Sequence, residues 1–220
     1  MTSRRHFLAT SAAAVAALSA PSILPRRAEA QQANWEAWDR QVTPVPYDPE
    51  SSNPWNLHPR FLPHRVQANL DLRPGDIHVD AVARYLYHIE EGGTAMRYGV
   101  AIGRDDLYQP GVFTVGRKAQ WPQWTPTASM IERDPHYAEW AGGMPGGPEN
   151  PLGARALYLY AGNRDTYLRI HGTPQPWSVG YRASSGCVRM VMRHIMDLYE
   201  NVEVGSTVHL YPAEERRYTG

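Results

Sequence analysis

The sequence has a single cysteine, Cys187, among its 220 residues. One thiol excludes the intramolecular disulfide framework that many small exported domains use to supplement a thin core. The chain also lacks internal repeats, runs of like charge and, beyond residues 9–24, any apolar segment that could span a bilayer. Its formal net charge is zero, and without residues 1–30 acidic residues are in slight excess. This balance argues against nucleic acid or another polyanion as a partner.

Glycine and proline, in contrast, are plentiful, with 18 and 19 residues. That frequency favours many turns and short strands over a helical bundle. The chain is 42% hydrophobic and 20% charged, so it can bury one substantial core. We therefore predict one mainly β domain with extensions.

The N-terminus resembles an export signal. Arg4 and Arg5 are followed by Phe-Leu and then by the alanine-rich, weakly apolar residues 9–24. Residues 28–30 read Ala-Glu-Ala, a small-x-small cleavage site. Paired arginines in this context resemble the signal of the twin-arginine route. We expect a periplasmic protein that begins near Gln31, and an ordinary Sec signal or an uncleaved anchor is the alternative.

Four segments are indicated by changes in composition along the chain. Residues 1–30 are the predicted export signal, 31–64 a Pro- and Trp-rich extension without clear periodicity, 65–212 the domain, and 213–220 a tail. Within the extension we expect Trp35, Trp38 and Trp55 to be packing anchors. Alternating patterns predict strands at residues 77–80, 83–89, 95–102, 111–115, 156–160, 167–170 and 207–211.

Two other elements can be placed. Ile195, Leu198 and Tyr199 are spaced i, i+3, i+4, which predicts one helix over residues 192–201, directly after the cysteine. Residues 121–147 combine aromatics with proline and paired glycines, which indicates a long structured insertion or lid. Within this insertion Trp121 and Trp124 are candidates for stacking on substrate, and packing on the core explains them equally well.

Cys187 is a candidate nucleophile, because a lone thiol in an exported chain requires an explanation. Gly186 before it allows a tight turn, and Arg189 places a cation two residues later. Both features suit a thiolate whose developing oxyanion is held by backbone N–H groups. An inert buried cysteine is the ordinary alternative, and the lack of an apolar run around Cys187 weighs against it.

A thiol nucleophile needs a general base, and the chain has nine histidines. His171 ends a predicted strand and precedes Gly172, so its ring can project into a cleft 16 residues before Cys187. His194 is the main rival, although we expect it on the polar, solvated face of the helix at 192–201. Spacing alone does not decide whether His171 or His194 is the base.

One predicted strand carries residues that could bind a metal. Asp76, His78 and Asp80 alternate on one of its faces, and a zinc D-alanyl peptidase would need such ligands. A solvated strand face explains them better, because no third imidazole has a suitable spacing. We predict neither a metal nor a cofactor.

The residues around His171 and Cys187 form a longer ordered pattern. They read His-Gly-Thr at 171–173, Ser-Val-Gly at 178–180 and Ser-Ser-Gly-Cys-Val-Arg-Met at 184–190, preceded by Gly-Arg-Lys-Ala at 116–119 and Met-Pro-Gly-Gly at 144–147. This pattern resembles the L,D-transpeptidases of the YkuD type, especially their proteobacterial branch, over about residues 65–211. The resemblance implies a YkuD-like β-sandwich with a short helix after the nucleophile loop.

The resemblance also implies roles for individual residues. Cys187 would attack a stem tetrapeptide and form a thioester, with His171 as base and the Gly172 carbonyl holding the imidazole. The N–H groups of Gly186 and Cys187 would bind the oxyanion, and Arg189 would orient the loop or a substrate carboxylate. Ser184 joins Trp121 and Trp124 as an expected substrate contact. Ser185 stands where many relatives have His, so it offers a hydroxyl hydrogen bond and no cation.

The function implied is peptidoglycan L,D-transpeptidation with 3-3 cross-links, and the expected partners are peptidoglycan stem peptides. Transfer to the amine of an outer-membrane protein, or hydrolysis of the donor, uses the same chemistry. A non-catalytic peptidoglycan-binding module is an alternative of another class, and the presence of both Cys187 and His171 argues against it. A papain-like protease is disfavoured because its nucleophile precedes its base in the chain.

Overall fold

The computed structural model describes residues 24–49 and 51–214. Most of the predicted export signal therefore lies outside the described residues. More of the described residues lie in strands than in helices, which confirms the mainly β prediction. The strands are β1 (His64–Gln67), β2 (Ile77–Asp80), β3 (Tyr85–Glu90), β4 (Thr94–Gly99), β5 (Ile102–Gly103), β6 (Gly111–Gln120), β7 (Arg155–Ala161), β8 (Arg164–Thr173), β9 (Arg182–Ser184), β10 (Val188–Val191) and β11 (Thr207–Leu210). The helices are α1 (Leu24–Val42), α2 (Ala128–Arg133) and α3 (Met192–Asn201), with short 3-10 turns η1 (Pro59–Phe61), η2 (Pro135–Trp140) and η3 (Pro176–Ser178).

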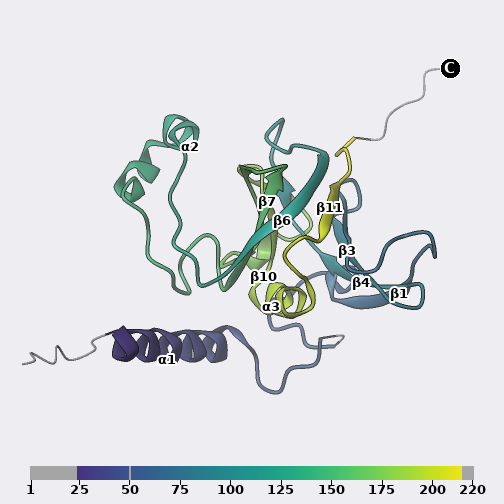
Figure 1. The fold of residues 1–220 in the computed structure, drawn as a ribbon, viewed down its shortest axis with the longest axis horizontal. Coiled ribbons are helices and arrows are strands. Elements are labelled where there is room, and N and C mark those ends of the chain that lie inside the picture. Colours follow the sequence, from purple (N-terminus) through teal and green to yellow (C-terminus); the bar gives the residue numbers. More distant parts are fainter. Residues whose placement is uncertain (1–23, 50, 215–220) are drawn as a thin grey trace, which may run out of the picture.

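Nine strands form one curved mixed sheet in the order β1-β4-β3-β2-β11-β6-β7-β8-β10, and β5 pairs with β9 in a second, small sheet (Figure 1). Two strand pairs of the large sheet are parallel. β11 lies parallel to β2 and joins the N-terminal strands to the rest of the sheet. β10 lies parallel to β8 at the other edge.

Each strand predicted from alternation overlaps an observed strand. The predicted strand 95–102, however, divides into β4 and β5, which belong to different sheets, and β1, β9 and β10 were not predicted. The hairpin of β3 and β4 pairs Tyr85 with Gly99 and Glu90 with Thr94 around a turn in which Gly92 and Gly93 have positive φ. Inward side chains such as Ile77, Leu86, Leu157 and Ile170 are fully buried in one core cluster. Each such side chain contributes roughly 1.5–3 kcal/mol by leaving water, so this cluster stabilises the sheet that carries the site.

Helix α3 starts and ends where the spacing predicts, and Ile195 and Leu198 are fully buried on its inner side. The chain's one lysine, Lys118, donates from Nζ to the carbonyl oxygens of Tyr199 and Val202, both at 2.5 Å. A cation is favourable there because the last carbonyls of a helix are unpaired and carry partial negative charge. Lys118 therefore fixes the C-terminal end of α3 against β6.

The expectation for His194 was wrong. The His194 side chain is completely buried instead of solvated. Its ring packs edge-on against Trp55, with the two ring centroids 5.1 Å apart. Burial, with a smaller effect of Arg193, lowers the pKa of His194 to about 3, so the ring is neutral. The helix has apolar contacts on two sides, to the sheet and to the chain before β1, which the spacing of its aliphatic residues alone did not reveal.

Helix α1, which was not predicted from the sequence, runs from the end of the predicted export signal into the N-terminal extension. Trp35, Trp38 and Val42 are spaced i, i+3, i+7 and pack on the domain, as expected of packing anchors. Asp39 accepts two hydrogen bonds from the buried guanidinium of Arg155, at 2.9 and 2.8 Å, and one from Trp121 Nε1 at 3.0 Å. Figure 1 shows α1 below the domain. No helix within residues 24–49 and 51–214 is long and apolar enough to cross a bilayer.

The predicted insertion between β6 and β7 is a lid that projects from the sheet (Figure 1). It contains α2 and η2, and Thr127 caps α2 by accepting a hydrogen bond from the Met130 N–H. Trp124 and Met144 close its base through a pair of backbone hydrogen bonds of 3.0 and 2.7 Å. The lid is thus an ordered element whose two ends are held together at the sheet.

Candidate active site

The loop that carries Cys187 connects β9 to β10 and is fixed by Ser184. The buried Ser184 hydroxyl donates to the Cys187 carbonyl at 2.5 Å and accepts from the Gly186 N–H at 3.1 Å. Gly186 has φ +128°, and a side chain there would approach the Leu107 carbonyl at 3.0 Å. Glycine is therefore required before the cysteine for both conformation and space.

The parallel pairing of β10 with β8 brings the predicted base to the nucleophile. Arg189 pairs with His171 and Val188 with Ile170, so Cys187 enters the sheet beside the strand that carries the histidine. The buried His171 ring approaches the Gly172 carbonyl with Nδ1 at 2.6 Å, as the family resemblance implies. An Nδ1–H donated to this carbonyl leaves Nε2 as the nitrogen that can accept a proton.

Both groups of this pair are in their neutral forms. Burial lowers the pKa of His171 to about 3, assisted by Arg189 and opposed by the carbonyls of Gly172 and Pro151. Burial also raises the pKa of the Cys187 thiol, although Arg169 and Arg189 act in the opposite direction. Both shifts favour a thiol and a neutral imidazole in the free protein.

The Cys187 thiol contacts the backbone of Tyr167, a residue that also lines the pocket. Its hydrogen bond runs to the Tyr167 carbonyl at 3.7 Å, and none joins it to His171 among the contacts of the described residues. Tyr167 has φ +62° and is largely exposed. Catalytic hydrogen bonds are often long or poorly aligned before substrate binds, so the lack of this contact does not exclude His171 as the base.

The two expected oxyanion donors differ in availability. The Gly186 N–H is engaged by Ser184 Oγ, whereas the Cys187 N–H has no acceptor within the described part of the chain. The Cys187 N–H is thus the backbone donor that remains open. Ser185 lines the same pocket, and its hydroxyl is a candidate for a second donor.

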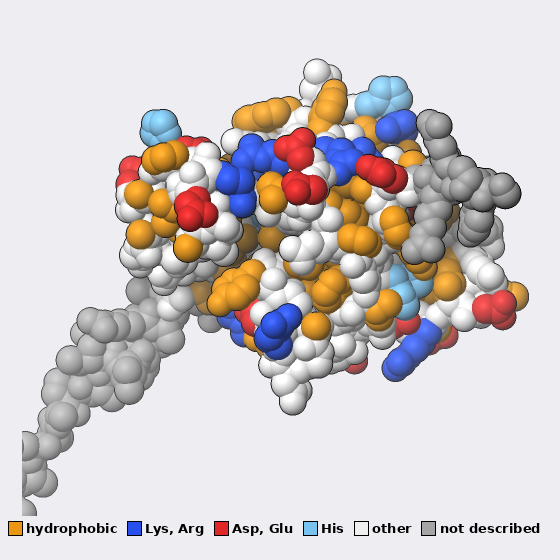
Figure 2. Space-filling view, turned by 90° about the horizontal axis from the view of Figure 1, so that it is seen from above, with side chains coloured by type: hydrophobic (Ala, Val, Ile, Leu, Met, Phe, Trp, Pro, Cys, Tyr) orange, Lys and Arg blue, Asp and Glu red, His pale blue; other side chains and the backbone are white. Residues whose placement is uncertain are grey.

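Cys187 and His171 line one pocket of about 970 Å³ that is cationic. Its wall includes Arg117, Arg133, Arg169 and Arg189, and no aspartate or glutamate among the described residues. Figure 2 views the molecule from the side of the lid and shows Lys and Arg side chains gathered in a row beside it. Such a pocket attracts ligands that carry carboxylates.

Two of the four pocket arginines, Arg117 and Arg169, are held in place by an aromatic ring, and Arg169 is also held by a carboxylate. The guanidinium groups of Arg117 and Arg169 lie over the Tyr158 ring at 3.5 and 4.0 Å. Arg169 also forms a two-pronged ion pair with Asp165, at 2.6 and 2.8 Å. Arg117, Arg133, Arg169 and Tyr158 were not predicted as site residues from the sequence. Two of them carried a usable signal. Arg169 lies two residues before His171 on the same strand face, and Arg117 lies within the family pattern at residues 116–119.

Of the other residues predicted to contact substrate or support the site, some line the pocket and one lies away from it. Trp124, Ser184 and Arg189 line the pocket, and Arg189 is held by a long hydrogen bond of 3.4 Å to Gln175. Trp121 is placed elsewhere, since it is buried against Trp38 and does not line the pocket. Its indole N–H binds Asp39, so its role in this structure is to dock α1.

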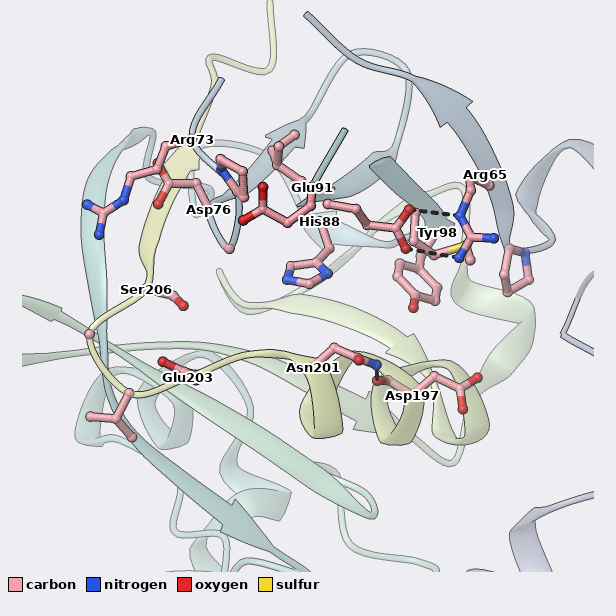
Figure 3. Close-up of a pocket in the computed structure, with 18 of the residues that line it drawn as sticks. Arg65, Arg73, Asp76, His88, Glu91, Tyr98, Asp197, Asn201, Glu203 and Ser206 are labelled. Atoms are coloured by element: carbon pink, nitrogen blue, oxygen red, sulfur yellow. Dashed lines mark hydrogen bonds and ion pairs between the residues drawn. The ribbon is translucent and has the colours of Figure 1, made fainter. Parts of the chain in front are cut away.

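A second cavity lies apart from the cysteine, between the first strands and α3 (Figure 3). Its volume is about 770 Å³, and none of the predicted catalytic residues line it. Figure 3 shows the side chains of Glu91, His88 and Tyr98 on the strand side and those of Asp197 and Asn201 on α3. Five carboxylate residues and two arginines line it, so its charge is opposite to that of the Cys187 pocket.

Fold and site together define a β-sheet domain in which Cys187 and His171 share one pocket. Residues 74–210 match the YkuD L,D-transpeptidase catalytic domain, more than half of the chain. The chain therefore belongs to the YkuD L,D-transpeptidase family.

Curated relatives agree with this assignment. A "Putative L,D-transpeptidase in ATP synthase subunits region ORF 5" of Fuscovulum blasticum is 35% identical over 60% of this chain and 66% of its own length. "Probable L,D-transpeptidase ErfK/SrfK" of Escherichia coli is 33% identical over 68% of this chain and 47% of its own. The chain thus matches less than two thirds of the length of these relatives.

One solved structure supports the fold. The structure named "Ldtfm-avibactam carbamoyl enzyme" is 19% identical, has a TM-score of 0.50, and is matched over 65% of this chain and 51% of its own. A chain from Brucella melitensis, named a "Probable carnitine operon oxidoreductase caia", is 49% identical over 70% of this chain and 96% of its own, with a TM-score of 0.49. The activity in that name belongs to the Brucella protein alone.

Replacement of Ser184 by Ala should slow acylation of Cys187 about tenfold, because it leaves the Gly186 N–H and the Cys187 carbonyl without their common partner. Rates of adduct formation by intact-mass spectrometry measure this. Ser178→Ala is the matched control, since Ser178 is also buried and donates to a loop carbonyl, Gln175, but does not line the pocket. Equal acylation rates in both variants would contradict a positioning role for Ser184.

Proposed function

We propose that this chain is a peptidoglycan L,D-transpeptidase that works through a Cys187 thioester. The observation that carries the proposal is the cationic pocket in which Cys187 and His171 lie together. Stem peptides carry several free carboxylates, and the four arginines of the pocket supply complementary charge. Membership in the YkuD family supports the same substrate class.

The proposed donor step is attack of Cys187 Sγ on the carbonyl of the third residue of a stem tetrapeptide. The thiol proton moves to His171 Nε2, because Nδ1 is directed at the Gly172 carbonyl. The Cys187 N–H stabilises the negative oxygen that forms. Collapse breaks the bond to the terminal D-alanine, which leaves with the proton from His171, and an S–C thioester remains.

The proposed acceptor step reverses the path. The side-chain amine of a second stem peptide attacks the thioester and gives a proton to His171. Breakage of the S–C bond then returns this proton to the Cys187 sulfur and leaves a 3-3 cross-link. Water in place of the amine gives hydrolysis, and no feature of the pocket favours an outer-membrane protein as acceptor.

Intact-mass measurement after incubation with a disaccharide tetrapeptide, and separately with a carbapenem, tests the proposal. Wild type should gain one adduct per chain, Cys187→Ala none, and His171→Ala should acylate about 10²–10⁴ times more slowly. His64→Ala, at an exposed position on β1, is the control and should behave as wild type. Well-folded wild-type protein that gains no adduct from either compound would overturn the proposal.

We further propose export by the twin-arginine route, cleavage near Ala30 and a periplasmic location. Arg4 and Arg5 with the following alanine-rich segment support this. Replacement of both arginines by lysine should keep the protein in the cytoplasm, measured by fractionation. Arg26→Lys with Arg27→Lys is the matched control and should be exported. Unimpaired export of the Arg4 and Arg5 variant would contradict the twin-arginine route.

A further inference from the structure

Two histidines from distant parts of the sequence meet on the outer face of the sheet. β2 and β11 run parallel with His78 opposite His209, and the rings stack with centroids 4.5 Å apart. Asp76, just before β2, adds a carboxylate. One ligand atom from each of the three residues lies within 4.8 Å of the others. Sequence spacing did not indicate His209 as a partner for His78, because the two histidines meet only through the pairing of β2 with β11.

His78 has a buried nitrogen that the protein does not use. Its Nδ1 lies 2.9 Å from the Tyr211 hydroxyl, while its Nε2 is shielded from solvent and lacks a hydrogen-bond partner within the described residues. The residue is only 7% exposed. A buried polar atom without a partner is costly and calls for a ligand or another explanation.

We propose that Asp76, His78 and His209 bind a divalent transition-metal ion, with Zn²⁺ as the expected ion. Two imidazoles and one carboxylate are a donor set that zinc takes, with water in the fourth position. Tyr211 supports this assignment, because metal-binding histidines usually donate their other ring N–H to an oxygen partner. Asp80 is outside the site, since its carboxylate accepts from the N–H groups of Val82 and Ala83.

The ligand atoms of Asp76, His78 and His209 must move slightly closer together to bind one ion. Ligand atoms of a tetrahedral zinc site lie about 3.3 Å apart, and Asp76 Oδ2 is now 3.9 Å from His209 Nε2. The two rings are nearly parallel, at an interplanar angle of 7°. Rotation about side-chain bonds would tilt them so that both Nε2 atoms converge on one ion, with no movement of the paired strands.

The surroundings suit a cation. Asp76 is on the wall of the acidic cavity of Figure 3, which gives a hydrated ion a path to the site. The carboxylates of that cavity raise the local concentration of cations.

The metal would act on the sheet and not on the thiol. None of the three residues lines the Cys187 pocket, and β11 is separated from β10 by three strands in the sheet order. The ion would instead tie β2 to the last strand at the join between the two halves of the sheet. Binding to the folded state alone stabilises a protein by mass action.

Equilibrium dialysis of the chelator-treated protein against Zn²⁺, with metal measured by mass spectrometry, tests the site. We expect one bound ion per chain in wild type and in Cys187→Ser, and at least tenfold weaker binding in His209→Ala. His64→Ala, an exposed histidine on β1, is the control and should bind as wild type. His209 is the residue to replace, because it is more exposed than His78 and its loss is less disruptive.

The imidazole ¹⁵N resonances of the wild-type protein provide a second readout that does not depend on a variant. Addition of Zn²⁺ should shift the Nε2 signals of His78 and His209. Unshifted Nε2 signals, or binding that disappears in Cys187→Ser and persists in His209→Ala, would overturn the proposal. Either result would mean that the two rings are only a stacked pair on the sheet.

Discussion

The parallel pairing of β8 with β10 is the contact on which the catalytic site depends. It sets His171 opposite Arg189 and brings Cys187 into the sheet beside the histidine strand. Ser184 then fixes the loop by two hydrogen bonds, and the Gly172 carbonyl fixes the imidazole. The shift of one strand by one residue would move the histidine to the opposite face of the sheet and separate the pair.

Charge divides the molecule into two regions. The lining of the Cys187 pocket includes four arginines and, among the described residues, no carboxylates, whereas the cavity between the first strands and α3 is lined by five acidic residues and two arginines. The first suits acidic stem peptides, and the second adjoins the proposed metal site. This separation allows metal binding at Asp76, His78 and His209 to alter stability while the chemistry at Cys187 stays unaffected.

Much of the domain could be predicted from the sequence, because its strands alternate and α3 has a clear apolar stripe. The family could also be inferred from the residues near Cys187, and the structure brings Cys187 and His171, the predicted nucleophile and base, into one pocket. Helix α1 was missed, since its stability depends on Asp39 meeting Arg155, a partner 116 residues away. The arginines around Tyr158 and the pairing of His78 with His209 were missed for the same reason. Contacts between distant strands are fixed by topology, which local patterns do not contain.

The neutral resting state of the Cys187 and His171 pair is the central claim, and its titration tests it most directly. Alkylation of Cys187 by iodoacetamide across pH, with the His171 ring followed by ¹⁵N NMR, measures both groups. Because burial raises the thiol pKa, alkylation should increase only above the usual thiol range near about pH 8.5. Because burial lowers the imidazole pKa to about 3, His171 should stay neutral throughout the mildly acidic range. A charged imidazole at neutral pH together with rapid alkylation in mild acid would contradict the account.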